Sequence, residues 1–415
     1  MKIILFHQYY LGKDDSGGSR WNQFTKYFTQ EDKDIHIEIM SGNIHYATGK
    51  QMSSKTWNSK EVISDKITLH RTWTYSGYNR SFFGRLLGYF SYSSSAFLKA
   101  LFIRDVDIII VTSPPIFVGL SGLVLSKVKK IPFIFEVRDL WPESAISTGV
   151  LNNKVIIKIL YSLEKMLYTH AEKIVLLTPA FKKDIIKRYP MVETKLKTVT
   201  NGADFDMPFD KKKRKIIREK YGWEDKKVFA YFGAHGVAND LEQIIAVANV
   251  YKNDDRILFV LIGDGMQKGE LKKLVNLYNL SNIQFIDSVS KMIVNDYIYA
   301  SDICIAILKK TDTFKTVYPN KVFDYMRCEK PILVTIDGIT RTLIEESKSG
   351  LYAPPEDVNA LKKVIDSFLL RSEEELKQMG IKGSLYVQLH FSREKLAVKY
   401  LKIIKKEFDA SIKKN

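Results

Sequence analysis

Residues 318–326 combine a helix-start signal with two charged side chains at a spacing that suits anion binding. Pro319 fits the first turn of a helix and Asn320 fits its cap, so we expect the N–H groups of this helix start to face a ligand. Lys321 and Asp324 are three residues apart and therefore share one helix face. A lysine suits a diphosphate and a carboxylate suits ribose hydroxyls. A surface ion pair between the two side chains is the alternative.

Glycine-containing loops follow three of the predicted strands. Glycine lets the backbone approach a phosphate closely, although in any one loop a tight turn is the simpler interpretation. Three such loops over two similar halves favour a phosphorylated ligand held between two domains. The candidate ligand-binding residues of these loops are Gly17, Gly18, Gly233, His235, Gly236, Gly263, Asp264 and Gly265.

Residues 135–144 place charged side chains at the carboxyl end of another predicted strand, next to a Trp-Pro turn. Rossmann-like enzymes carry ligand-binding and catalytic groups at such strand ends. Arg138 and Asp139 are therefore candidate catalytic residues, and Trp141 and Glu143 are candidates for a loop that contacts a second substrate. A capping and loop-ordering role for Asp139 and Glu143 is equally open.

The elements that must position these segments follow a repeated strand–helix pattern. In the first half, strands are predicted at residues 3–6, 35–40, 108–112, 133–137, 173–177 and 197–199. In the second half, they are predicted at residues 228–232, 257–262, 283–286, 303–308 and 331–334. Strands that alternate with helices predict parallel, doubly wound sheets. The fold class is therefore α/β, with two Rossmann-like domains.

The predicted N-terminal domain spans residues 1–205, and a basic amphipathic helix at residues 392–415 is expected to complete it. The predicted C-terminal domain spans residues 206–391, and its charged start at residues 206–220 reads as the linker. The N-terminus lacks the features of a signal peptide, and no apolar run is long enough to cross a membrane. Two cysteines without metal or redox spacing suit a reducing cytoplasm.

The net charge of +17 attracts polyanions, which include nucleic acid, anionic membranes and phosphorylated substrates. A nucleic-acid-binding protein is disfavoured because the basic residues are spread through helices and no reader motif is present. The three Asp-x-Asp pairs, which begin at Asp32, Asp105 and Asp204, read as solvated turns, so we expect no metal and no cofactor.

At these residues the sequence resembles the retaining glycosyltransferases of family 4, which have the two-domain fold called GT-B. The similarity follows almost the whole chain in order and is strongest for the enzymes of O-antigen and capsule assembly that transfer fucosamine-type or other N-acetylated sugars. A nucleotide-sugar epimerase of the same architecture is the alternative. The motifs that carry the resemblance lie at residues 17–18, 112–115, 138–144, 201–204, 263–265, 319–321 and 324–326.

The resemblance implies a nucleotide-sugar donor, with UDP favoured, and a polyprenyl-diphosphate-linked glycan as acceptor. Gly17, Gly18 and Arg20 would lie near the donor diphosphate, and Arg138 and Asp139 beside the reacting sugar. Lys321 would bind the diphosphate and Asp324 the ribose, with retention of configuration at the sugar. Thr316 departs from the family pattern, which has an acid at that position on the donor side.

Residues 79–104 carry aromatic and basic side chains in an amphipathic pattern, which suits a membrane interface. A pair of helices packed on the N-terminal sheet is the alternative. Basic pairs at residues 182–183, 187–188 and 405–406 would add attraction to anionic lipids. We therefore expect a cytoplasmic protein that is peripherally attached to the inner face of the cell membrane.

Overall fold

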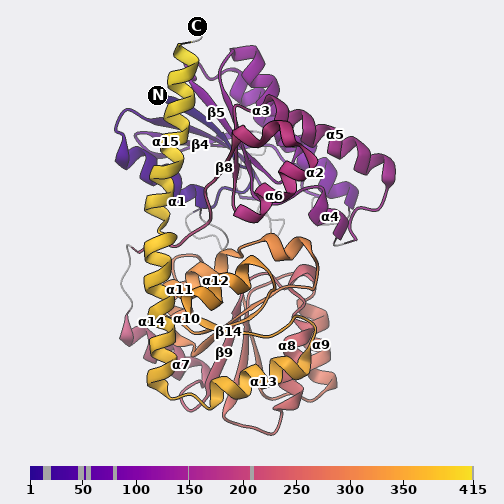
Figure 1. Ribbon diagram of the computed structural model, residues 1–415, viewed down its shortest axis with the longest axis vertical. Coiled ribbons are helices and arrows are strands. Elements are labelled where there is room, and N and C mark those ends of the chain that lie inside the picture. Colours follow the sequence, from indigo (N-terminus) through magenta and orange to yellow (C-terminus); the bar gives the residue numbers. More distant parts are fainter. Residues whose placement is uncertain are drawn as a thin grey trace. The chain divides into compact units, whose positions relative to one another are not determined.

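The computed structural model describes residues 1–12, 20–44, 51–52, 58–77, 82–147, 149–205 and 210–413. The chain folds into two compact units, which Figure 1 shows in colours that follow the sequence. Of the described residues, unit 1 contains 1–12, 20–200 and 393–413, and unit 2 contains 201–392. The predicted divisions are at 205/206 and 391/392, and the units divide at 200/201 and 392/393.

Unit 1 is built on an eight-stranded sheet of order β3-β4-β2-β1-β5-β6-β7-β8. The strands are parallel except for the antiparallel pair β3 and β4 at one edge. Four neighbouring strands, β1, β5, β6 and β7, are nearly continuous apolar runs, which is typical of strands with helices on both faces of the sheet. The strands are β1 (Lys2–Phe6), β2 (His36–Gly42), β3 (Asn58–Ser64), β4 (Ile67–Thr72), β5 (Ile108–Ser113), β6 (Phe133–Val137), β7 (Lys173–Leu176) and β8 (Leu196–Thr198).

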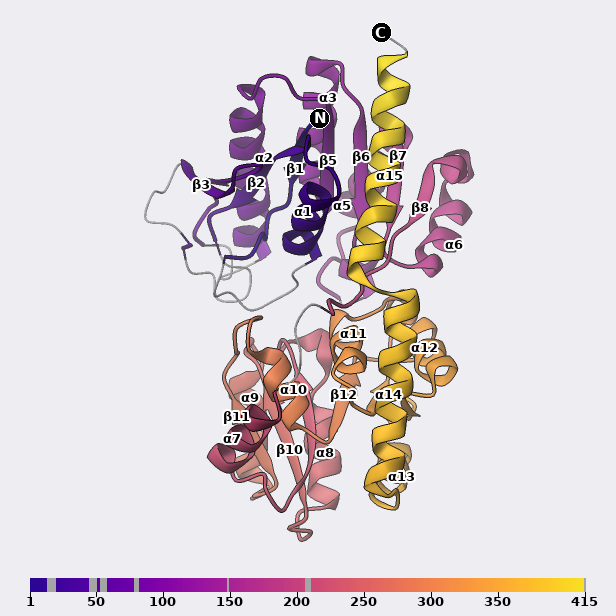
Figure 2. The ribbon, with the colours of Figure 1, turned by 90° about the vertical axis from the view of Figure 1, so that its left-hand side faces the viewer.

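The last helix of the chain packs on the sheet of unit 1. Figure 2 shows α15 beside α1, and the Tyr400 ring of α15 lies 5.4–6.1 Å from the rings of Trp21, Phe24 and Phe28. An ion pair of 3.2 Å between Glu407 and Lys173 holds α15 to β7. The helices of unit 1 are α1 (Arg20–Glu31), α2 (Phe82–Leu101), α3 (Phe117–Lys129), α4 (Glu143–Ser147), α5 (Lys154–His170), α6 (Pro179–Arg188), the 3-10 helix η1 (Pro190–Lys195) and α15 (Arg393–Ile412).

Unit 2 is built on a six-stranded parallel sheet of order β11-β10-β9-β12-β13-β14. Its core has two layers, because alternate residues of β9 face opposite sides of the sheet. The strands are β9 (Lys227–Phe232), β10 (Ile257–Ile262), β11 (Ile283–Ile286), β12 (Ile303–Ile307), β13 (Ile332–Thr335) and β14 (Gly350–Tyr352). The helices are α7 (Lys211–Tyr221), η2 (Val237–Asn239), α8 (Glu242–Val250), α9 (Lys268–Leu277), α10 (Val294–Ala300), η3 (Thr313–Thr316), α11 (Asn320–Arg327), α12 (Ile339–Ser347), α13 (Val358–Leu369) and α14 (Glu373–His390).

Each sheet has one point at which the direction of strand addition reverses. In unit 1, β1 lies between β2 and β5, and in unit 2, β9 lies between β10 and β12. Such a point is called the switch point of the sheet. Open α/β sheets bind ligands there, beyond the carboxyl ends of the strands. The prediction of two Rossmann-like parallel-sheet domains is confirmed, and the strand order adds the two positions where a site is expected.

Two predicted segments have a different structure from the one expected. The predicted linker is the helix α7 from residue 211 onward, and Arg214 and Arg218 anchor it by ion pairs of 3.1 Å to Asp302, directly before β12. The charged composition of α7 reflects these ion pairs and the exposed outer face of the helix. The predicted pair of helices at residues 79–104 is one 20-residue helix, α2.

Candidate active site

The glycine loops of unit 2 follow β9 and β10 and pack against each other backbone to backbone. Gly233, Gly263 and Gly265 have φ angles of 143°, 149° and 157°, which favour glycine. A Cβ on Gly263 would lie 1.9 Å from the carbonyl oxygen of Gly233, and one on Gly265 would lie 2.4 Å from that of His235. The two loops therefore depend on glycine for their mutual contact, and they define the carboxyl edge of the sheet at its switch point.

Lys321 extends from the first turn of α11 toward the Gly233 loop. Its Nζ atom lies 3.7 Å from the ring centroid of Tyr231, and a Cβ on Gly233 would lie 2.8 Å from that Nζ. The Nζ is shielded from solvent, and no hydrogen-bond acceptor reaches it among the residues that the structure describes. Burial lowers the pKa of Lys321 to about 7. A buried amine at a switch point, with no acceptor within reach in the described part of the chain, indicates an anion site in unit 2.

The start of α11 differs in detail from the expectation. Pro319 is the N-cap residue and no side chain caps the helix, so Asn320 is the first helical residue and not the cap. Asp324 pairs with Lys291 at 2.7 Å, which excludes the predicted alternative of an ion pair between Asp324 and Lys321. The Thr316 hydroxyl, in the turn before the helix, donates to the carbonyl of Thr313 at 2.7 Å.

His235 is fully buried in the loop after β9. Within the described parts of the chain, neither ring nitrogen has a hydrogen-bond partner. Burial, with a smaller contribution from the nearby Lys268, lowers the pKa of His235 to about 4, so the imidazole is neutral at physiological pH. Asp264 is turned to its own loop, because its Oδ1 accepts from the N–H of Gly265 at 2.8 Å. Gly236 precedes the short helix η2.

The switch point of unit 1 brings together side chains from three strands. His7 follows β1, Thr112 belongs to the end of β5 and Arg138 follows β6. The His7 Nδ1 lies 2.8 Å from the Thr112 Oγ1 and 3.4 Å from Nη1 of Arg138. Burial, and then the charge of Arg138, hold the pKa of His7 well below its usual range. Sequence reasoning missed His7, although a histidine directly after the first strand was the available signal.

The loop after β6 carries the remaining candidates of unit 1. Burial raises the pKa of Asp139, which a hydrogen bond from Ser144 opposes. The Trp141 ring lies 6.0 Å from that of Phe117 on α3. Glu143 accepts from the Tyr161 hydroxyl at 2.7 Å and lies 3.1 Å from Arg188, as part of an ordered network. For Glu143 the structure therefore favours the loop-ordering alternative over contact with an acceptor.

Two arginines that were predicted to contact lipid or ligand form ion pairs within unit 1. Arg188 lies 2.6 Å from the buried Glu164 as well as near Glu143, so its charge is neutralised within unit 1. Arg20, expected near the donor diphosphate, is buried and pairs with Glu136 at 3.1 Å. Its guanidinium also donates to the carbonyls of Val199 and Thr200. The contacts of Arg20 that the structure shows are thus internal to unit 1, while Gly17 and Gly18 lie outside the described residues.

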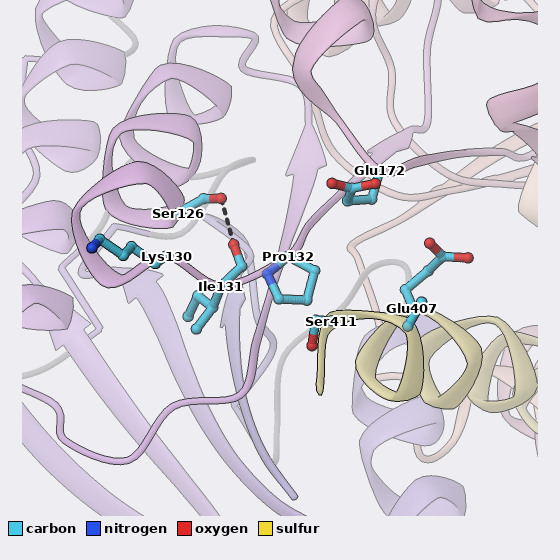
Figure 3. Close-up of a pocket in the computed structure, with 8 residues that line it drawn as sticks. Ser126, Lys130, Ile131, Pro132, Glu172, Glu407 and Ser411 are labelled. Atoms are coloured by element: carbon cyan, nitrogen blue, oxygen red, sulfur yellow. Dashed lines mark hydrogen bonds between the residues drawn. The ribbon is translucent and has the colours of Figure 1, made fainter. Parts of the chain in front are cut away.

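The residues that the structure describes contain no group of three or more His, Cys, Asp or Glu side chains placed to hold a metal ion. In the same residues, no helix combines the length and the hydropathy that a membrane crossing requires. A hollow of about 250 Å³ lies where α15 meets the start of β6, and Figure 3 shows Glu407, Glu172 and Lys130 around it. Because it lies at the amino ends of the strands, this hollow is separate from the candidate site.

Two Rossmann-like parallel-sheet units, each with polar side chains gathered at its switch point, give the architecture called GT-B. Residues 61–207 match the family described as Glycosyltransferase Family 4, and residues 213–384 match Glycosyl transferases group 1. The first matched segment thus carries a domain similar to one glycosyltransferase family, and the second carries a domain similar to the other.

The chain is also similar to individual glycosyltransferases in sequence and to a solved structure in fold. The chain is 24% identical to the probable glycosyltransferase WbjE of Pseudomonas aeruginosa over 67% of this chain and 69% of WbjE. It is 26% identical to the putative colanic acid biosynthesis glycosyl transferase WcaI of Escherichia coli K12 over 35% of this chain and only 36% of WcaI. The crystal structure of Anabaena HepE with UDP-glucose has a TM-score of 0.72 and 13% identity, covering 98% of this chain and 100% of HepE.

Proposed function

We propose that the protein transfers a sugar, with retention of configuration, from a UDP-sugar to a polyprenyl-diphosphate-linked glycan in the assembly of a bacterial surface polysaccharide. The sugar is an N-acetylated hexosamine or deoxyhexosamine. The observation that carries the proposal is the buried Nζ of Lys321, which faces the glycine loops without an acceptor among the described residues. The UDP-glucose bound to HepE and the biosynthetic role in the name of WcaI support the donor and the pathway class.

In this proposal unit 2 holds the nucleotide. Lys321 contacts the diphosphate, and N–H groups at the uncapped start of α11 and in the Gly233–Gly236 loop complete the anion site. Asp324 accepts from the ribose hydroxyls and Lys291 orients its carboxylate. The bond between the anomeric carbon and the phosphate oxygen breaks as negative charge builds on the diphosphate. Lys321 stabilises this charge, so its contribution is greatest in the transition state.

Unit 1 supplies the groups that position the acceptor. The acceptor hydroxyl oxygen bonds to the anomeric carbon, and its proton passes to the departing phosphate oxygen on the same face. Arg138 attracts the phosphorylated part of a substrate, and the neutral His7, fixed by Thr112, offers a hydrogen-bonding group that adds no charge. Asp139, with its raised pKa, contacts the reacting sugar. Catalysis then rests on orientation and electrostatics and needs no protein nucleophile.

A thermal-shift screen against UDP, GDP, CDP and dTDP tests the donor site. A ligand present at 100 times its dissociation constant adds about 2.7 kcal/mol to folding stability, so the correct nucleotide is expected to raise the Tm clearly. Release of UDP from a UDP-sugar must then depend on an acceptor. Conversion of the sugar without acceptor would assign the chain to the epimerases, and absence of any nucleotide effect would refute the donor site. We propose that transfer persists in EDTA, and loss of activity that magnesium restores would contradict this.

We also propose that the protein works at the inner face of the cell membrane. Phe102, directly after α2, and Leu120 and Val128 on α3 are exposed apolar side chains. Lys127 and Lys130 near the end of α3 add positive charge. Sedimentation with vesicles that contain anionic lipid should carry the protein down, and the bound fraction should fall with salt. Equal sedimentation with neutral vesicles would contradict the electrostatic part of the proposal.

A further inference from the structure

A hollow of about 380 Å³ lies on unit 1 between α2 and the segment that follows β4. Among the residues that the structure describes, no charged side chain lines it. Five apolar or aromatic side chains and three serines, on the segment after β4 and on α2, line it: Trp73, Tyr75, Leu87, Phe90, Ser91, Ser94, Ser95 and Leu98. Tyr75, Leu87, Phe90 and Leu98 are exposed to solvent, at 38–57% of their full surface. Exposed apolar groups that gather in one hollow mark a binding surface more often than scattered ones do.

Two of the serines do not make the hollow polar, because their hydroxyls bond to the backbone. The Ser91 hydroxyl donates to the carbonyl of Gly88 at 3.0 Å and accepts from the N–H of Tyr75 at 2.9 Å. The Ser95 hydroxyl donates to the carbonyl of Trp73 at 2.7 Å. These bonds also fix the segment after β4 to α2. The hollow is therefore a preformed apolar slot with ordered walls.

Aromatic contacts connect this slot to the candidate site of unit 1. The Phe90 ring lies 4.4 Å from that of Phe117, and the Phe117 ring lies 6.0 Å from that of Trp141. Trp141 follows Arg138 and Asp139 in the loop after β6. The slot also begins directly after β4, whose carboxyl end lies at the same edge of the sheet as His7 and Arg138. A row of aromatic side chains thus connects the slot with the loop that carries Arg138.

We infer that this slot binds the isoprenoid chain of the lipid-linked acceptor, next to the diphosphate. The inference rests on the proposed function, because it assigns a place to the lipid part of the proposed acceptor. The slot is lined by apolar and aromatic side chains, and the rings of Phe117 and Trp141 lie between it and the loop of Arg138. A methyl-branched apolar chain fits the slot, and the anionic head of the same molecule suits Arg138. Burial of the chain against these side chains gives the affinity, and Arg138 sets the direction in which the lipid lies.

The probe for this inference is a benzophenone-bearing farnesyl diphosphate, photo-crosslinked to the full chain and mapped by mass spectrometry. We expect adducts on peptides that contain residues 73–98, and competition by unlabelled farnesyl diphosphate but not by inorganic diphosphate. Adducts that lie elsewhere, or that farnesyl diphosphate does not displace, would overturn the inference.

A double variant, Phe90→Gln with Leu98→Gln, tests the slot itself. Both side chains are about half exposed, at 49% and 57%, so the fold should persist, which the Tm checks. We expect half-saturation of labelling to require at least tenfold more probe. The matched control is Ile159→Gln on α5, which is 61% exposed and does not line the slot, and it should label like the wild type. If the double variant labels normally but no longer sediments with vesicles, these side chains contact the bilayer and do not bind the isoprenoid chain.

The nucleotide screen separates a failure here from a failure of the proposed function. A UDP-induced rise in Tm without labelling of the slot would refute the slot alone. Labelling of the slot without any nucleotide effect would refute the glycosyl-transfer proposal and leave an isoprenoid site in unit 1.

Discussion

Replacement of Lys321 by methionine should make the protein more stable and its nucleotide site weaker. Met keeps most of the length of the side chain and its packing against Tyr231, but removes the buried amine. A residue that served only the fold would show the opposite sign, because its loss would destabilise the protein. The combination of higher stability and lower affinity is therefore specific to a charge that is held for a ligand.

The magnitude follows from the pKa of Lys321, which burial lowers from 10.5 to about 7. A shift of this size corresponds to about 5 kcal/mol against the charged form, and the contact with the Tyr231 ring returns about 1–2 kcal/mol. We therefore expect Lys321→Met to raise the free energy of unfolding by about 3 kcal/mol at pH 7. Loss of charge-assisted bonds of about 1.5–3 kcal/mol should weaken UDP binding roughly 10- to 150-fold.

The gain in stability should depend on pH with a defined sign. Between pH 7 and 10.5 the unfolded chain binds the Lys321 proton more strongly than the folded protein does, so the wild type gains stability as pH rises through this window. At pH 9.5 the amine of the folded protein is mostly neutral, and the advantage of the Met variant should shrink to about 1 kcal/mol. Below pH 7 the advantage should be constant.

Urea unfolding at pH 7 and pH 9.5, and a UDP titration followed by Tm, measure both effects. Lys330→Met is the matched control, because burial also lowers the pKa of Lys330, to about 8, while its Nζ lies over the Tyr299 ring. This control should leave UDP affinity unchanged. A Lys321→Met protein that is less stable than the wild type, or that binds UDP equally well, would refute the reasoning.

Three further outcomes are expected. Gly263→Ala should lower the free energy of unfolding, measured in urea, by at least about 2 kcal/mol, because Gly263 has a positive φ angle and its Cβ would collide with the Gly233 carbonyl. Gly269→Ala is the control and should not lower it, because open space surrounds Gly269. Arg20→Met should cost about 3–5 kcal/mol by leaving Glu136 buried and unpaired, and adding Glu136→Gln should restore part of the loss in the same assay. Arg138→Gln should reduce turnover at least tenfold while the UDP-induced rise in Tm persists, and a lost Tm response would contradict the assignment of Arg138 to the acceptor side.

Local sequence determined the elements that carry the site. The apolar runs of β1, β5, β9 and β10 are recognisable because strands covered on both faces lack polar residues. The edge strand β3 has a mixed polar sequence and no such run, so it was missed. The segment predicted to be a linker is a helix with Asp210 as its N-cap and Gly222 as its C-cap, and its arginines pair with Asp302, which is distant in sequence.

The chemical groups at the strand ends were also readable, since Lys321 follows a helix-start signal and Arg138 follows an apolar strand. What only the tertiary structure decided was the partner of each group. Strand order places His7 beside Thr112, 105 residues away in sequence, and brings Arg20 into an ion pair with Glu136. In unit 2, Lys321 is buried over the Tyr231 ring, and no acceptor reaches its Nζ among the described residues. Such pairings depend on which strands are neighbours, and this depends on packing over the whole unit, which local periodicity does not encode.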